Sequence, residues 1–190
     1  MAETSRMVRL GTEMPPFKLP NIDGRMVSPD DYPDAKGFLV VFACNHCPYV
    51  VHVKDELAKI ANEYSELGIA VFAICANDIE NYPDDSPENM KIKAEEWGWN
   101  FPYLFDESQE VAKAYGAVCT PDIFLFNSDK KLVYRGQMDD SRPGNMKPVN
   151  GADLRLALDA VVNGEMPSDE QKPSVGCSIK WKPGNAPPYA

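Results

Sequence analysis

Continuous apolar runs alternate along this chain with stretches of helical periodicity. The run at 37–43 (GFLVVFA) is rich in Val and Phe, which is typical of a buried strand. Apolar residues then recur at helical spacing, which predicts a helix over about 46–66, and Gly68 suits its C-terminal cap. A second apolar run at 69–76 has the length of a central parallel strand. The order strand, helix, strand predicts a parallel pair with a crossover helix.

Shorter elements follow, and their order sets the fold class. We expect a helix from Ser86 to about Trp97, strands at 101–105, 122–126 and 131–135, a short helix at 106–116 and a last helix at 151–163. Residues 11–36 are predicted to be extended with a hairpin turn at Asp23-Gly24. This pattern predicts an α/β fold in which a central mixed sheet is flanked by helices. We assign residues 1–163 to one domain with an N-terminal strand extension, and 164–190 to a Pro-rich C-terminal tail that packs on it.

Charge and composition exclude several classes of function. The chain has 190 residues and a net charge of −10, which argues against a nucleic-acid-binding surface or docking on anionic lipid. No apolar run has the length of a transmembrane helix. The first residues, 1–6, lack the apolar core of a secretion signal, so a cytoplasmic location is expected.

The cysteines indicate redox chemistry. Their number, five, is odd, and a structural disulfide framework is not expected in a reducing compartment. Cys44 and Cys47 lie in the motif CNHCP directly after the first predicted strand. Unpaired backbone N–H groups and the dipole at a helix start lower the pKa of a cysteine placed there. Two cysteines at this spacing can also close a small disulfide ring, so the motif predicts a reversible dithiol centre that needs no cofactor.

Each residue of the motif has an expected role. We predict Cys44, partly exposed at the helix start, as the nucleophile and Cys47, deeper in the first turn, as the resolving thiol. A charged His46 beside Cys44 would favour the thiolate, and the alternative for His46 is a solvated helix cap. Asn45 is expected to shape the site, and Pro48 to keep the helix start rigid.

The unit of strand, Cys-x-x-Cys and helix, followed by Thr120-Pro121 before a later strand, resembles the thioredoxin superfamily. The N-terminal extension and the segment from Phe105 to Gly116 resemble its peroxiredoxin (AhpC/TSA, redoxin) branch, over roughly residues 9–163. This resemblance implies a thioredoxin-like fold in which a cis-proline, Pro121, faces the dithiol. It also implies that the backbone of Thr120 offers hydrogen bonds to a bound chain.

The chain departs from both family patterns at chemically important positions. Aligned on Cys47, the peroxiredoxin Thr position holds Cys44 and the Pro position holds Val40, and the stretch 119–126 lacks the activating Arg. The buried acid that thioredoxins carry upstream of the dithiol is replaced by Phe38. A different base must therefore deprotonate Cys47 during disulfide release.

The other cysteines have separate expected roles. Peroxiredoxins often place a resolving cysteine in a C-terminal segment, and Cys177 lies in the tail. Our hypothesis is that the tail folds over the dithiol, anchored by Ile179 and Trp181, and that Cys177 exchanges with Cys44 or Cys47; the alternative is simple packing. Cys75 and Cys119 are expected to be packed as small apolar side chains.

The sequence favours an enzyme, a thiol–disulfide oxidoreductase that uses the Cys44/Cys47 dithiol. Its partners would be a disulfide-containing protein, or a small-molecule disulfide or peroxide, and an electron-donating dithiol protein. A homodimer is among the assemblies that the peroxiredoxin resemblance implies.

One alternative is a thiol-dependent peroxidase with an antioxidant role and Cys177 as resolving cysteine. Another class is a copper-binding thioredoxin-like chaperone using Cys44, His46 and Cys47. Such chaperones usually have a Cys-x-x-x-Cys spacing and a His on a late loop, and this chain has neither, so no metal ligand is predicted. A further alternative is a redox sensor without enzymatic activity.

Overall fold

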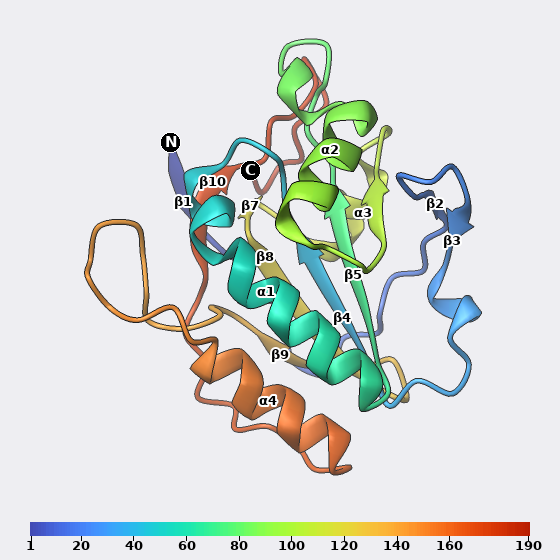
Figure 1. Ribbon diagram of the computed structural model, residues 1–190, viewed down its shortest axis with the longest axis vertical. Helices are drawn as coiled ribbons and strands as arrows, with labels where there is room; N and C mark the ends of the chain where they lie inside the picture. The colour runs from blue at the N-terminus through green and yellow to red at the C-terminus, as the bar shows by residue number, and fades with distance from the viewer.

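A five-stranded mixed sheet lies at the centre of the computed structural model, which describes residues 1–190 (Figure 1). Its strand order is β6-β5-β4-β8-β9. Strands β4 (Gly37–Phe42), β5 (Ile69–Cys75) and β6 (Tyr103–Phe105) are parallel. Strands β8 (Asp122–Asn127) and β9 (Leu132–Arg135) run antiparallel to them. The predicted mixed α/β sheet is therefore confirmed, with the hairpin on one side of β4.

Helices cover both faces of this sheet. Helix α1 (Pro48–Glu66), α2 (Pro87–Trp97) and α4 (Ala152–Val162) pack on one face, where α1 and α4 lie in front of the strands in Figure 1. The short helix α3 (Glu110–Tyr115) and the N-terminal segment pack on the other face. Helix α1 begins at Pro48, not at about 46, because Cys47 has extended backbone angles and forms the N-cap.

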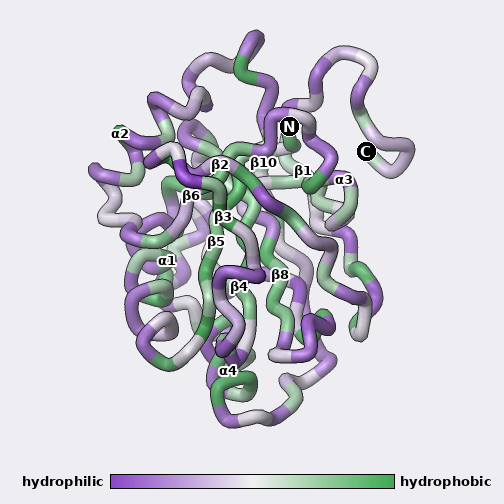
Figure 2. The backbone as a smooth tube through the Cα atoms, turned by 90° about the vertical axis from the view of Figure 1, so that its right-hand side faces the viewer, coloured by the Kyte–Doolittle hydropathy of each residue, from purple (hydrophilic) through white to green (hydrophobic).

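Alternation along β4 divides the core into two hydrophobic clusters. Leu39 and Val41 belong to the cluster under α1, whereas Phe38, Val40 and Phe42 belong to the cluster on the opposite face. Successive side chains of a strand point to opposite faces, so a strand buried on both sides reads as a continuous apolar run. Figure 2 shows these hydrophobic central strands inside a more hydrophilic periphery.

A second, smaller sheet joins the two chain termini to the strand that precedes β8. Its order is β1-β10-β7, formed by β1 (Ala2–Thr4), β10 (Val175–Ser178) and β7 (Cys119–Thr120). In Figure 1 the N-terminal β1 and the C-terminal β10 lie side by side near the start of α1. The segment after α4 therefore contributes a strand at the end of the sheet where β4 leads into α1.

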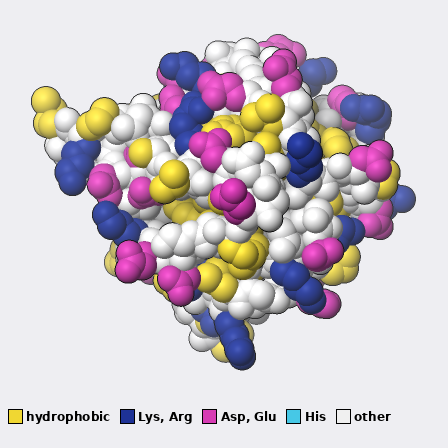
Figure 3. Space-filling model, turned by 90° about the horizontal axis from the view of Figure 1, so that it is seen from below, with side chains coloured by type: hydrophobic (Ala, Val, Ile, Leu, Met, Phe, Trp, Pro, Cys, Tyr) yellow, Lys and Arg dark blue, Asp and Glu magenta, His cyan; other side chains and the backbone are white.

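A hairpin and two short turns lie outside the two sheets and the four helices. A two-stranded hairpin forms from β2 (Leu19–Pro20) and β3 (Met26–Val27), as the Asp23-Gly24 turn signal predicted. Single 3-10 turns cover Pro29–Asp31 and Pro83–Asp85. None of the helices has both the length and the apolar content needed to span a membrane. On the face seen in Figure 3, acidic and basic side chains are interspersed rather than gathered by sign.

Candidate active site

The Cys-x-x-Cys motif occupies the connection between β4 and α1. Cys44 follows the last residues of the strand, and Cys47 is the N-cap of the helix with Pro48 behind it. A proline at the first helical position loses no hydrogen bond, because that N–H would have no partner in the helix. The backbone N–H of Val50 donates to the carbonyl oxygen of Cys47 at 3.0 Å and also lowers the pKa of its thiol. The stabilising effect of the helix start therefore falls on Cys47, whereas the sequence predicted it for Cys44.

Both thiols are buried. Cys44 is 1% exposed and Cys47 is 0% exposed, so the predicted partial exposure of Cys44 is wrong. Thr120 lies directly against the pair: Cys47 Sγ is 3.2 Å from its carbonyl oxygen, and Cys44 Sγ is 3.6 Å from its hydroxyl oxygen. The structure thus brings Thr120 to the dithiol, as the thioredoxin resemblance implied, and the Thr120-Pro121 peptide bond is cis.

The two thiols differ in their ionisation. A hydrogen bond from Cys44 lowers the pKa of Cys47 far below its ordinary value, helped by Cys177, the Thr120 hydroxyl and the Val50 N–H, although burial opposes the shift. The same hydrogen bond raises the pKa of Cys44, together with burial and the negative charge of Asp85. The two shifts are opposite in direction and arise mainly from one shared contact between the sulfurs. The lowered pKa of Cys47 favours it as the nucleophile, whereas the sequence predicted Cys44 for that role.

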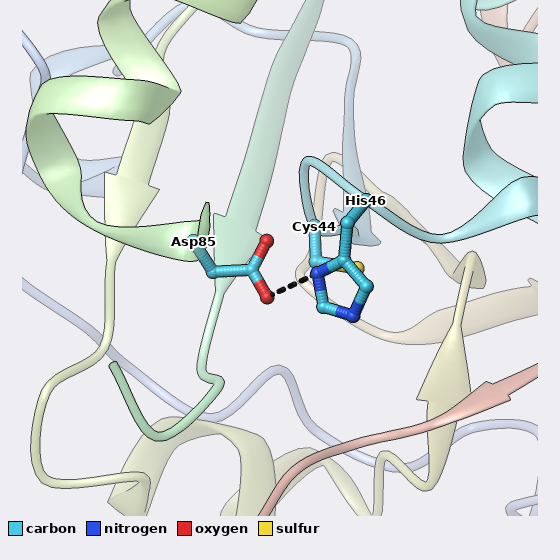
Figure 4. Close-up of side chains that lie close together, drawn as sticks. All are labelled: Cys44, His46 and Asp85. Atoms are coloured by element: carbon cyan, nitrogen blue, oxygen red, sulfur yellow. Dashed lines mark ion pairs between the residues drawn. The ribbon is translucent and has the colours of Figure 1, made fainter. Parts of the chain in front are cut away.

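Asp85 is a member of the site that the sequence did not reveal. Residues 77–85 are polar and acidic, as is typical of a solvated loop, but Asp85 is 0% exposed and Asn77 and Asp78 are also buried. The Asp85 carboxylate lies 2.7 Å from His46 Nδ1 and accepts hydrogen bonds from the Asn45 N–H and Asn77 Nδ2. Figure 4 shows Asp85 and His46 paired beside Cys44. No local pattern distinguishes Asp85 from its exposed neighbour Asp84.

Asn45 holds the connection between the cysteines in shape. Its side-chain Nδ2 donates to the carbonyl oxygen of Asp84 at 2.8 Å, and its Oδ1 accepts from the Tyr103 hydroxyl at 2.9 Å. Asn45 is itself 4% exposed, so both contacts lie in the interior. The site-shaping role predicted for Asn45 thus has a defined set of hydrogen-bond partners.

Cys44, His46 and Asp85 also offer one sulfur, one nitrogen and one oxygen that all lie within 4.8 Å of one another. Zn²⁺ binds ligand atoms of these three types. The metal-binding alternative from the sequence named Cys44, His46 and Cys47, whereas the group in the structure contains Asp85 instead of Cys47. The carboxylate is already satisfied by His46, Asn45 and Asn77. The arrangement is therefore complete as a hydrogen-bonded Asp85–His46 pair next to a thiol.

Cys177 lies next to Cys47. Strand β10 pairs with β7 so that Cys177 is opposite Thr120, and burial followed by a hydrogen bond to Cys47 raises the pKa of Cys177 to about 11. A side chain at Gly176 would place its Cβ 2.0 Å from the carbonyl oxygen of Thr120. The protein's own tail thus occupies the backbone edge of Thr120 that we had expected to receive a bound chain.

The remaining cysteines are buried away from the reacting pair. Burial is the largest cause that raises the pKa of both Cys75 and Cys119, so neither is ionised at neutral pH. Cys119 Sγ lies 3.6 Å from the carbonyl oxygen of Pro121, and its neighbour Asp122 is fully buried. This agrees with the packing roles expected for both cysteines.

Comparisons with known proteins agree with this geometry. The Redoxin family model matches residues 9–153. A crystal structure of an uncharacterised conserved protein from Geobacillus kaustophilus is 54% identical, with a TM-score of 0.94, and the match covers 97% of this chain and 98% of that one. Thiol-disulfide oxidoreductase ResA from Bacillus thuringiensis is 24% identical over 66% of this chain and 68% of its own length.

The fold has a thioredoxin-like neighbour as well. The thioredoxin domain of a thiol-disulfide oxidoreductase from Bacteroides vulgatus superposes with a TM-score of 0.59 at 22% identity, over 70% of this chain and 91% of that one. The predicted thioredoxin-like fold is thereby confirmed. With the dithiol at the strand–helix junction and a family match over most of its length, the chain belongs to the Redoxin family.

Proposed function

We propose that this protein is a thiol–disulfide oxidoreductase in which Cys47 is the nucleophile and Cys44 the resolving thiol. The observation that carries the proposal is the buried Cys44–Cys47 pair at the start of α1, where Cys47 is the N-cap and the contact with Cys44 lowers its pKa. The thiolate is the form of cysteine that attacks a disulfide. The similarity to ResA, a protein named for thiol–disulfide exchange, supports the same activity.

The reaction has two exchange steps. Cys47 Sγ attacks one sulfur of a substrate disulfide; a Cys47–substrate bond forms, the substrate bond breaks, and one substrate thiolate leaves. Cys44 Sγ then attacks Cys47 Sγ, which forms the Cys44–Cys47 disulfide and releases the second substrate thiolate. A dithiol donor protein returns the pair to its reduced form by the reverse steps. The substrate is a disulfide-containing protein or a small disulfide.

A second candidate is thiol-dependent peroxide reduction. It is favoured by one observation, the grouping of two further thiols, Cys44 and Cys177, around the Cys47 thiolate. Peroxide would convert Cys47 to a sulfenic acid with loss of water or alcohol, and Cys44 or Cys177 would then displace water to form a disulfide. We also propose that the protein has an antioxidant role, is located in the cytoplasm and forms a homodimer.

Serine variants of the two cysteines test the first candidate. Cys44→Ser keeps a hydroxyl donor to Cys47, so we expect it to form a stable mixed disulfide at Cys47 with an aromatic disulfide at pH 7. Cys47→Ser should react roughly tenfold or more slowly, because an ordinary thiol is only a few per cent thiolate at pH 7. Stopped-flow absorbance and peptide mass spectrometry report both, with Cys75→Ala as the control. A mixed disulfide that forms at Cys44 first would contradict the assignment.

One equivalent of hydrogen peroxide, added to the reduced wild-type protein, separates the two candidates. Slow oxidation to Cys44–Cys47 alone supports the exchange enzyme. Rapid oxidation with a sulfenic acid trapped at Cys47, or a bond to Cys177 that disappears in Cys177→Ser, supports the peroxidase.

A further inference from the structure

Closing the disulfide in the proposed order requires Cys44 to lose its proton in a buried place. Cys44 is 1% exposed, and Cys47 beside it is 0% exposed. Phe38 stands where related dithiol proteins carry a buried acid. If the proposed exchange reaction is correct, some other group must take the proton of Cys44, and this inference rests on that reaction.

Asp85 and His46 lie where such a group is needed. Cys44 Sγ, a ring nitrogen of His46 and a carboxylate oxygen of Asp85 all lie within 4.8 Å of one another (Figure 4). The side chain of Asp85 is 0% exposed, whereas that of His46 is 33% exposed. The pair therefore connects a buried sulfur to the solvent.

Both members of the pair are held in position by other contacts. Asp85 accepts from the backbone N–H of Asn45 at 2.8 Å and from Asn77 Nδ2 at 2.9 Å, besides its 2.7 Å contact with His46 Nδ1. The His46 ring lies parallel to that of Tyr82, with 6.2 Å between the centroids. A general base oriented by a carboxylate and placed beside a thiol is the arrangement by which many enzymes activate a nucleophile.

We propose that the Asp85–His46 pair accepts the proton of Cys44 as the disulfide with Cys47 closes. The S–H bond of Cys44 breaks, its electron pair forms the bond to Cys47 Sγ, and the electron pair of the broken bond leaves on the substrate sulfur. The pair gains one proton, which converts His46 to the imidazolium opposite the Asp85 carboxylate, and the exposed ring returns it to water. His46 is the proton acceptor and Asp85 is its positioning residue.

The other titratable groups around the pair are unsuited to this task. Cys75 and Tyr103 stay protonated because burial raises the pKa of each. Cys47 is the sulfur under attack. The exposed rim carries Tyr82, Asp84 and Lys93. Of these groups, His46 and Asp85 alone combine closeness to Cys44 with a path to solvent.

Two-step kinetics of oxidation test the proposal. Reduced protein is mixed with an aromatic disulfide, and release of the first and the second substrate thiolate is followed from pH 5 to 9. In His46→Gln we expect the first step to stay within about twofold and the second to slow by about 10²-fold at pH 7, the usual size of general-base catalysis; in Asp85→Asn we expect the second step to slow to a similar degree. The second step of the wild type should rise with pH to a plateau, and that plateau should be lost in His46→Gln.

His52→Gln is the matched control, because His52 contacts Ser141 and not the dithiol. An unchanged second step in His46→Gln, or equal slowing of both steps, would overturn the proposal. If Asp85→Asn does not fold, His46→Gln alone tests the proposal. An unchanged first step in His46→Gln shows that the dithiol site of this variant is intact. A wild type that shows no second thiolate release would instead refute the exchange reaction itself.

Discussion

Cys44 and Cys47 are chemically identical side chains whose surroundings shift their pKa values in opposite directions. Contacts with Cys44, Cys177, Thr120 and the N–H of Val50 lower the pKa of Cys47, although burial raises it. Cys44 faces the buried carboxylate of Asp85, which disfavours a second negative charge. The difference between the pKa values of the two thiols therefore arises from their nearest neighbours. These are hydrogen-bonding groups around Cys47 and the carboxylate of Asp85 near Cys44.

Asp122 tests how strongly burial shifts the pKa of a single side chain. It is fully buried, which raises its pKa from 3.8 to about 7 although the N–H groups of Val118 and Cys119 donate to it. The folded state therefore binds a proton that the unfolded state has lost between about pH 4 and 7, and the free energy of unfolding falls as pH rises through that range. Asp122→Asn should gain stability relative to the wild type over this window, by up to about 4 kcal/mol at pH 8.

Urea unfolding from pH 4 to 8 measures this difference. Asp55→Asn serves as the control, because the Asp55 side chain is 75% exposed. Parallel stability curves for Asp122→Asn and the wild type would show that Asp122 does not titrate in this range.

At the scale of elements, strand β10 determines what can reach the dithiol. Its neighbours fix it on both sides of Cys177: Ser5 N–H donates to the Ser174 carbonyl oxygen at 2.9 Å, and Ile179 N–H donates to that of Val118 at 3.0 Å. Further along, the buried side chain of Gln109 donates to the carbonyl oxygen of Lys180. A large protein substrate therefore needs β10 to move before its backbone can pair with Thr120.

Gly176→Val should displace this strand. The added Cβ would lie 2.0 Å from the Thr120 carbonyl oxygen, and overpacking of this kind costs about 1–3 kcal/mol. We expect Cys47 and Cys177 to react faster with an uncharged maleimide, since the strand that covers them opens more often. Peptide mass spectrometry after timed quenching gives the rates. Ala186→Val, an exposed position on the same tail, is the control, and equal rates in both variants would mean that β10 stays in place.

At the scale of the whole molecule, β4 carries both the core and the site. It is buried along its whole length, pairs with β5 and β8, and leads directly into the dithiol. The −10 net charge lies mostly outside this core, and the face in Figure 3 mixes charges of both signs. The rigidity of the site therefore depends on packing against β4 and little on surface charge.

Leu39→Ala measures how much this packing contributes. Leu39 is 0% exposed in the middle of β4, so its truncation should lower the free energy of unfolding by about 2–5 kcal/mol. Leu156→Ala is a matched control, because Leu156 is 71% exposed on α4 and its loss should cost within about 0.5 kcal/mol. Denaturant unfolding gives both values, and similar losses would contradict a core centred on β4.

The sequence by itself determined the features that depend on neighbouring residues. The apolar runs at 37–43 and 69–76 predicted β4 and β5, because burial on both faces leaves a continuous local pattern. The spacing of Cys44 and Cys47 predicted the dithiol, and Thr120-Pro121 predicted its opposite wall. Only the tertiary structure placed Asp85 beside His46, because its burial arises where two loops meet. It also placed Cys177 next to Cys47 and so shifted the pKa values of both thiols, since charge and burial at a sulfur are summed over segments far apart in the chain.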